Sequence, residues 1–137
     1  MAHWLFKSEP SAWSFDKLAR LGAAGTDWSG VRNHSAKLNM QSMKVGEQGF
    51  FYHSNEGKAI VGIVEICKAY RPDPTDPSGK FGMVDIRAVR PLPRPVTLEE
   101  AKNDERLAGM ALVTNSRLSV QRVTDAEWAH VLKLGGR

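Results

Sequence analysis

The residues best suited to chemistry are concentrated in one segment, WSGVRNHSAKLNM, which spans positions 28–40. Trp28 offers an indole, Arg32 a permanent positive charge and Asn33 an amide, on either side of a glycine. An aromatic face combined with amide and hydroxyl groups is what holds a nucleobase that has left its strand. The segment therefore predicts a site for a planar heterocycle, although core packing would also account for its aromatic residue.

Other side chains along the chain could complete such a site. Stacking partners for Trp28 could come from Phe51, Tyr52 and Phe81, and polar groups for the base edge from Ser8, Asn33, Ser54, Asn115 and Ser116. A phosphate beside the base needs a cation or a helix N-terminus. Arg32 and Lys7 are candidate cations, with solvated surface ion pairs as the alternative, and a helix that begins after Asn33 would supply free N–H groups.

The sequence lacks the motifs for metal binding, for a phosphate-binding loop and for a cysteine nucleophile. The chain has one cysteine and four histidines, with no H-x-x-x-H or H-E-x-x-H spacing, so we expect neither a metal nor a cofactor. No phosphate-binding loop of the G-x-x-x-x-G-K-[ST] or G-x-G-x-x-G type occurs. Cys67 follows an apolar run, and we expect it to be a small buried residue rather than a nucleophile.

Length and composition predict a single domain over residues 1–137. The chain has 42% hydrophobic and 25% charged residues, and it contains no apolar run of the roughly 20 residues that a membrane helix needs. The net charge of +4 and the pI near 9.4 are compatible with a nucleic-acid partner, although the basic residues are scattered. The lack of a secretory signal pattern and the single cysteine predict a reducing compartment, the cytoplasm or, if the source has one, a nucleus.

The elements that must position these residues are short strands and helices. Strands are predicted at 3–7, 49–53, 59–70 and 83–89 and within 117–123. Helices are predicted at 15–21 with Ser14 as the cap and after Asn33 with Asn33 as the cap. Two more are predicted between Thr97 and Gly109 and from Thr124 to Gly135, with the capping patterns Thr97/Glu100 and Thr124/Glu127. Strands dispersed among short helices indicate an α+β fold on a curved, mixed or antiparallel sheet.

Several motifs together resemble those of the EVE domain family. They are KSEP at 7–10, WSGVRN at 28–33, KVG and FFYHSN within 44–55, GIVE at 62–65 and RLSVQ at 117–121. This family is similar to YTH domains and belongs to the PUA-like superfamily. The resemblance implies a curved, barrel-like mixed sheet flanked by short helices, and an aromatic pocket that reads a modified base.

The resemblance also implies residue roles. Lys7 and Ser8 match the start of the pocket floor, Trp28 matches the first cage tryptophan, and Asn33 matches a base-contacting asparagine. The full set predicted to contact the base is Lys7, Ser8, Trp28, Asn33, Tyr52, His53, Ser54 and Phe81. The set predicted to contact phosphate or the nucleic-acid backbone is Arg32, Lys37, Asn115, Ser116 and Arg117.

The sequence departs from the family pattern at one position. YTH domains and many EVE relatives have a second cage tryptophan just before the MVDI strand, where this chain has Phe81, whose ring has less stacking area. The resulting hypothesis is a non-enzymatic domain that binds DNA or RNA carrying a methylated cytosine or adenine. Two alternatives stay open: a nuclease or base-modifying hydrolase that uses His53 with Ser8 or Glu9, and a module that binds a small molecule or a peptide.

Overall fold

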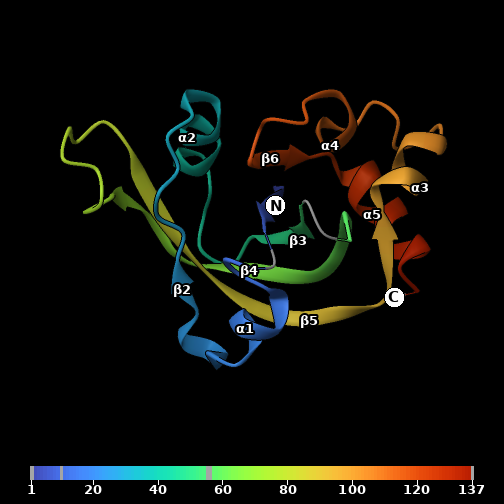
Figure 1. Cartoon of the computed structure of the whole chain (residues 1–137), viewed down its shortest axis with the longest axis horizontal. Helices are drawn as coiled ribbons and strands as arrows, with labels where there is room; N and C mark the ends of the chain where they lie inside the picture. The colour runs from blue at the N-terminus through green and yellow to red at the C-terminus, as the bar shows by residue number, and fades with distance from the viewer. Residues whose placement is uncertain (1, 10, 55–56, 137) are drawn as a thin grey trace.

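The chain folds around one mixed β-sheet. The computed structural model describes residues 2–9, 11–54 and 57–136. The elements are β1 (His3–Ser8), α1 (Phe15–Ala19), the 3₁₀ turn η1 (Gly22–Ala24), β2 (Thr26–Asp27), α2 (His34–Gln41), β3 (Gln48–His53), β4 (Ala59–Pro72), β5 (Gly82–Thr97), α3 (Leu98–Asn103), α4 (Ala111–Thr114), β6 (Val120–Val123) and α5 (Asp125–Leu134). Figure 1 shows β4 and β5 as long curved strands, with α2 toward one end of the molecule and α3, α4 and α5 toward the other.

The strand order across the sheet is β2-β5-β4-β3-β1-β6. β1 pairs with β3 in parallel, and the remaining neighbours pair antiparallel. The prediction of a curved mixed sheet flanked by short helices is confirmed. In the described part of the chain β2 and β6 lie at opposite ends of this order, so the sheet is open rather than a closed barrel.

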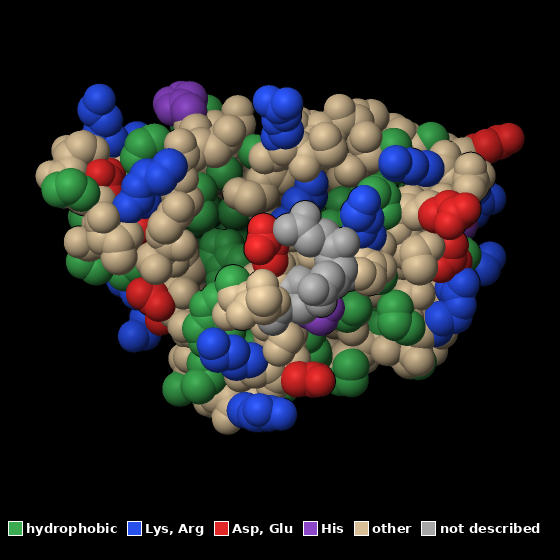
Figure 2. Space-filling view, viewed as in Figure 1, with side chains coloured by type: hydrophobic (Ala, Val, Ile, Leu, Met, Phe, Trp, Pro, Cys, Tyr) green, Lys and Arg blue, Asp and Glu red, His purple; other side chains and the backbone are tan. Residues whose placement is uncertain are grey.

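The sheet separates two hydrophobic cores, because successive side chains of a strand point to opposite faces. Along β1, Trp4 and Phe6 enter the core that also contains Trp28, whereas Leu5 enters the core beneath α5 with Phe50. Figure 2 shows one face of the molecule hollowed near its centre, with hydrophobic side chains at the bottom of the hollow and Lys and Arg side chains on the surface around it.

The predicted helix starts are confirmed. The Ser14 hydroxyl accepts a hydrogen bond from Lys17 N–H at 3.1 Å, and Asn33 caps α2 in the same way. Reciprocal capping boxes form at Thr97/Glu100 and Thr124/Glu127. Such caps satisfy backbone N–H groups that have no partner inside the helix, and each contributes about 1 kcal/mol to stability.

Element ends differ from the prediction where distant pairing decides them. β5 continues to Thr97 through Pro91, Pro93 and Pro95, and its pairing with β4 shifts register near Gly62, which accommodates prolines that cannot donate to the ladder. α3 ends at Asn103, six residues before Gly109, and α1 ends at Ala19. The glycine-rich stretch before Trp28 contains β2, which the sequence did not predict.

Cys67 is half-buried rather than buried, which corrects the prediction. It lies on β4 at a register shift between Ile66 and Lys68, where the regular alternation of faces is interrupted. Burial, with a further contribution from Asp85, raises the pKa of its thiol, so Cys67 stays protonated and is a weak nucleophile.

Candidate base-binding site

A cavity of about 370 Å³ opens beside the end of β1 and the loop that follows β2. Its lining residues are Lys7, Ser8, Glu9, Trp13, Asp27, Trp28, Ser29, Gly30, Val31, Arg32 and Ser119. Four predicted site residues, Lys7, Ser8, Trp28 and Arg32, are therefore brought together from two distant segments. Ligand pockets typically measure about 300–1,000 Å³, so the cavity is large enough for one base.

Trp28 lines this cavity but is only 8% exposed. Its backbone N–H donates to the Val84 carbonyl at 2.7 Å, which ties it to β5. Its indole packs edge-on against Phe6 and Phe51, with ring centroids 5.6 and 5.9 Å away. Both interpretations of Trp28 are thus partly right: most of the indole belongs to the core, and a small part faces the cavity.

Trp13 is a cavity residue that the sequence analysis missed. It is half-buried, so more of its indole is free than in Trp28, and the Lys17 ammonium lies 4.6 Å from its ring centroid. Its backbone N–H donates to the Glu9 carbonyl at 2.9 Å, which holds it beside the end of β1. The signal in the sequence was weak, because an aromatic residue just before the Ser14 cap is also typical of helix packing.

The lining residues also include two carboxylates: Asp27, which the sequence did not point to, and Glu9, which was predicted only for the enzyme alternative. Glu9 and Asp27 are both exposed and lie on the cavity with the half-buried Lys7. A carboxylate accepts hydrogen bonds and repels phosphate, so the cavity itself suits an uncharged group with N–H donors, such as the amino edge of a base. Phosphates would then contact the surface outside it.

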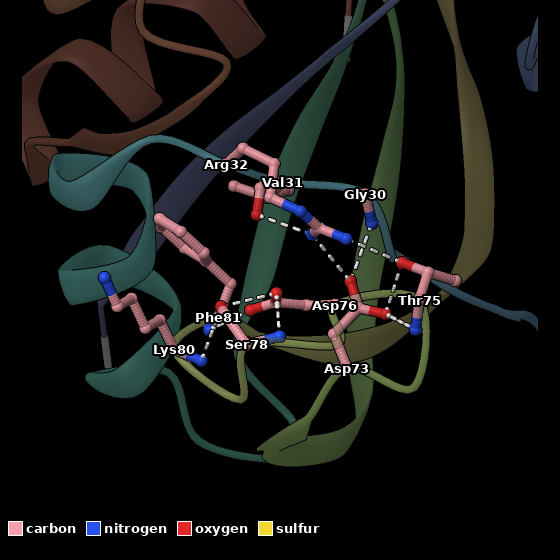
Figure 3. A network of polar contacts seen from close by, with 9 residues as sticks. All are labelled: Gly30, Val31, Arg32, Asp73, Thr75, Asp76, Ser78, Lys80 and Phe81. Atoms are coloured by element: carbon pink, nitrogen blue, oxygen red, sulfur yellow. Dashed lines mark hydrogen bonds and ion pairs between the residues drawn. The ribbon is translucent and has the colours of Figure 1, made fainter.

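A buried carboxylate holds the loop of residues 28–32, which we call the 28–32 loop (Figure 3). Asp73 Oδ2 accepts from Gly30 N–H at 2.8 Å and from Arg32 Nη1 at 3.2 Å, and its Oδ1 accepts from the backbone N–H and the hydroxyl of Thr75 at 2.7 and 2.6 Å. Burial raises the pKa of Asp73, but these hydrogen bonds outweigh it and lower the pKa to about 2. Gly30 has a φ of +83°, which favours glycine at this turn.

Asp76 organises the other end of the connection between β4 and β5, to which Asp73 also belongs. It accepts from the Ser78 hydroxyl at 2.6 Å and from Phe81 N–H at 2.8 Å, which lowers its pKa to about 2 (Figure 3). The Phe81 ring lies 5.9 Å from the Arg32 guanidinium and 5.8 Å from Lys37 Nζ. Phe81 does not line the cavity, so its role as a second stacking wall stays a prediction, as does a phosphate contact of Lys37.

Asn33 caps α2 and does not line the cavity. Its Oδ1 accepts from Ala36 N–H at 2.9 Å, while the residue itself is exposed. The oxygen is therefore engaged within the protein. The Nδ2 donor is therefore the freer atom of Asn33 for a contact with a base.

The three predicted residues around the end of β3 lie away from the cavity. Tyr52 is 3% exposed in the core beneath α5, and burial raises its pKa. His53 Nε2 accepts from Phe15 N–H at 3.1 Å, and burial lowers the pKa of its imidazole against a smaller opposing effect of Asp16. Ser54 is half-buried, and its N–H donates to the Ser8 carbonyl at 2.9 Å. These residues support the site from beneath.

The predicted backbone-binding residues 115–117 lie in the exposed loop before β6. Lys7 Nζ donates to the Ser116 carbonyl at 2.8 Å, and burial lowers the pKa of this ammonium. The Asn115 carbonyl is paired with Gln121 Nε2 at 3.3 Å. Ser119, a few residues on, lines the cavity, and Arg117 is an exposed residue of the same loop that does not itself line the cavity.

Two other cavities, of about 460 and 490 Å³, share Arg106 and His130 at α5. Both are lined mainly by charged or aliphatic side chains, with the imidazole of His130 and no Trp, Tyr or Phe. They are larger than the cavity at Trp28, but their chemistry does not suit a nucleobase. Among residues 2–9, 11–54 and 57–136 no group of three or more His, Cys, Asp or Glu side chains could hold a metal ion.

Comparison with known proteins identifies relatives of the whole arrangement. The EVE domain family model matches residues 2–134. The NMR structure of Rpa0253 from Rhodopseudomonas palustris is 60% identical with a TM-score of 0.95, covering 99% of this chain and 94% of that one. Human thymocyte nuclear protein 1 is 36% identical over 165 residues, which cover 97% of this chain and 73% of the human protein.

The structure of the human protein, THYN1, was determined in complex with DNA containing 5-methylcytosine. It superimposes with a TM-score of 0.94 at 35% identity and covers 100% of this chain and 99% of that one. The YTH domain of Zygosaccharomyces rouxii MRB1, in complex with N6-methyladenosine RNA, has a TM-score of 0.59 at 20% identity, covering 99% of this chain and 85% of that one, and shows similarity of fold alone. On the family match and these identities, the chain belongs to the EVE domain family.

Proposed function

We propose that this chain is a non-enzymatic nucleic-acid-binding domain that holds one modified base in the cavity between Trp13 and Trp28. The observation that carries the proposal is this cavity of about 370 Å³, which has two indoles in its lining and lies in the fold of a human relative determined with 5-methylcytosine DNA. Aromatic faces stack on a base that has left its strand, and polar groups then contact its edge. We propose that residues 1–137 act as one such domain, in the cytoplasm or a nucleus.

The geometry also disfavours the catalytic alternatives that would use His53 or Cys67. A general base needs a free lone pair within reach of its substrate. His53 Nε2 accepts the Phe15 N–H, so in the neutral imidazole the other nitrogen carries the proton and no lone pair is free, and His53 lies outside the lining of the cavity. Cys67, on β4, is also outside that lining.

The structure describes no helix that is long and apolar enough to cross a membrane. The human relative is named a nuclear protein.

Direct binding measurements test the proposal. Fluorescently labelled oligonucleotides carrying 5-methylcytosine, cytosine, thymine or N6-methyladenine, each in DNA and RNA, would be titrated with the protein. One buried methyl carbon contributes about 0.8 kcal/mol, which corresponds to roughly fourfold tighter binding of 5-methylcytosine than of cytosine. If no modified strand binds more tightly than its unmodified twin, the proposal is wrong.

Substitution of the stacking residues locates the site. Trp13→Ala should weaken binding of the preferred strand about five- to 150-fold, because a stacked base contributes roughly 1–3 kcal/mol, and Trp13→Phe should recover part of this. Trp28→Ala is less informative because removing a buried indole costs about 3–5 kcal/mol of stability, so Trp28→Phe is the better variant. Val45→Ala, at an exposed position outside the cavity, is the control.

Two further readouts address the alternatives. Release of a nucleotide or an altered base during incubation, lost in His53→Ala, would indicate an enzyme. Binding of oligonucleotides that is unaffected by Trp13→Ala and Trp28→Phe would place the nucleic acid elsewhere and leave the cavity for a small molecule or a peptide.

A further inference from the structure

The Asp73 carboxylate is the point at which two loops meet. Its side chain has no exposed surface, and its two oxygens divide their partners: Oδ2 holds Gly30 and Arg32, whereas Oδ1 holds Thr75 (Figure 3). A buried carboxylate is stable only when such donors compensate for its lost hydration. The partners of Oδ2 both lie in the 28–32 loop, which lines the cavity, so this one group fixes the loop against the connection between β4 and β5.

Arg32 is engaged in the same network with both terminal nitrogens. Nη1 donates to the Val31 carbonyl at 3.1 Å and to Asp73, and Nη2 donates to the Thr75 hydroxyl at 2.9 Å. Its side chain keeps 39% of its surface exposed, so the hydrogen bonds rather than burial hold the guanidinium in place. A guanidinium that binds phosphate in a bidentate manner presents its N–H groups outward, but here three of them point into the protein.

We infer that Asp73 is a positioning residue that sets the 28–32 loop for base binding, and that Arg32 belongs to this network rather than to the phosphate contacts. The inference rests on the proposed function for its effect on nucleic acid. Its structural half, the attachment of Gly30 to Asp73, is independent of any ligand. Arg117, which is exposed in the loop before β6 and for which no ion pair is found among the described residues, is the contrasting case.

Asp73→Asn tests the positioning role. One acceptor oxygen becomes an NH₂ donor, so either Gly30 and Arg32 or Thr75 lose their acceptor. Affinity for the methylated strand should fall about tenfold or more, because the 28–32 loop loses hydrogen bonds to a charged group, and the preference for the methyl group should disappear. The amide of Gly30 should exchange with solvent several-fold faster, as measured by NMR.

A second variant in the same loop covers the case in which Asp73→Asn does not fold. Thr75→Val keeps the shape of the side chain and removes the hydroxyl between Asp73 and Arg32, and it should change binding and Gly30 exchange in the same direction. Ser78→Ala is the matched control. It removes a hydroxyl that is bonded to Asp76, so the hydrogen bonds of Asp73, the partner of Gly30, stay the same. Gly30 exchange in Asp73→Asn as slow as in the parent protein would overturn the inference, and where that variant does not fold the same result in Thr75→Val would do so.

The salt dependence of binding separates the two arginines. Removing one phosphate contact lowers the slope of log K against log salt by about 0.9 for duplex DNA. We expect this change in Arg117→Gln, with the methyl preference retained, whereas Arg32→Gln should lower affinity and methyl preference with an unchanged slope. A slope reduced by about 0.9 in Arg32→Gln, with methyl preference intact, would show that Arg32 contacts phosphate. Absence of methyl preference in the parent protein would refute the proposed function, and Gly30 exchange would still decide the role of Asp73.

Discussion

Asn33 has two predicted roles that substitution can separate, because its two amide atoms are in different situations. Oδ1 caps α2 at 2.9 Å from Ala36 N, whereas Nδ2 is on an exposed residue and is the freer atom for contact with a base. Asn33→Ala removes both atoms and should cost about 1 kcal/mol of stability, which lowers Tm by about 4 °C for a chain of this size. Asn33→Ser keeps a capping oxygen, so its stability should remain within about 0.5 kcal/mol of the parent protein.

The two variants differ from each other in the cap but not in the base contact. If Nδ2 donates to the base, both should weaken binding of the methylated strand by about the same factor, roughly five- to tenfold for one hydrogen bond. Thermal unfolding followed by circular dichroism gives the stability, and fluorescence anisotropy gives the affinity at a temperature where both variants are folded. Full affinity in Asn33→Ser would refute base contact and leave Asn33 as a cap alone.

Two further predictions concern the support beneath the site. His53 accepts a hydrogen bond as a neutral imidazole, and burial lowers its pKa. Its contribution to stability is therefore complete above the ordinary pKa near 6.5 and is lost as the pH falls through the lower pKa of the folded state. His53→Gln should flatten this pH dependence of the free energy of unfolding, measured with urea between about pH 7.5 and 5, and an unchanged profile would contradict the prediction. At Gly62 an added Cβ would lie 2.4 Å from Phe15 Cε1, so Gly62→Ala should destabilise the protein by about 1–3 kcal/mol. Gly109→Ala is the control, because a Cβ added there would meet open space. Equal urea midpoints for the two variants would show that α1 moves aside without cost.

The local features of this fold were predictable from the sequence because they depend on neighbouring residues. The caps at Ser14, Asn33, Thr97 and Thr124 each need a hydroxyl or amide within three residues of its partner, and all four form. The extent of β5 was not predictable in this way. Prolines normally end a strand, and what allows this one to continue to Thr97 is a shifted register against β4, a partner more than 20 residues away in sequence.

The residues of the site were likewise predictable from local sequence only in part. Residue type and resemblance pointed to Trp28, which does line a cavity, but they could not show how much of its indole is covered by Phe6 and Phe51. Trp13 was missed because its neighbour in the cavity lies 15 positions further along the chain and no motif marks it. Candidates on the paired strands β1 and β3 also differ in position. Ser8 lines the cavity, whereas Tyr52 lies in the core beneath α5 and His53 bonds to α1.

Arg32 shows why charge alone is a weak guide to a nucleic-acid surface. In the sequence Arg32 and Arg117 are equivalent cations, and both were assigned to phosphate. The difference arises from Asp73, which is 41 residues from Arg32 and reaches it only because the connection between β4 and β5 folds back on the 28–32 loop. A guanidinium already bonded to a buried carboxylate contributes little free charge, since moving it to a phosphate would leave that carboxylate without a partner. Arg117, exposed in the loop before β6, has no such cost, so the electrostatic attraction for nucleic acid should come from that loop.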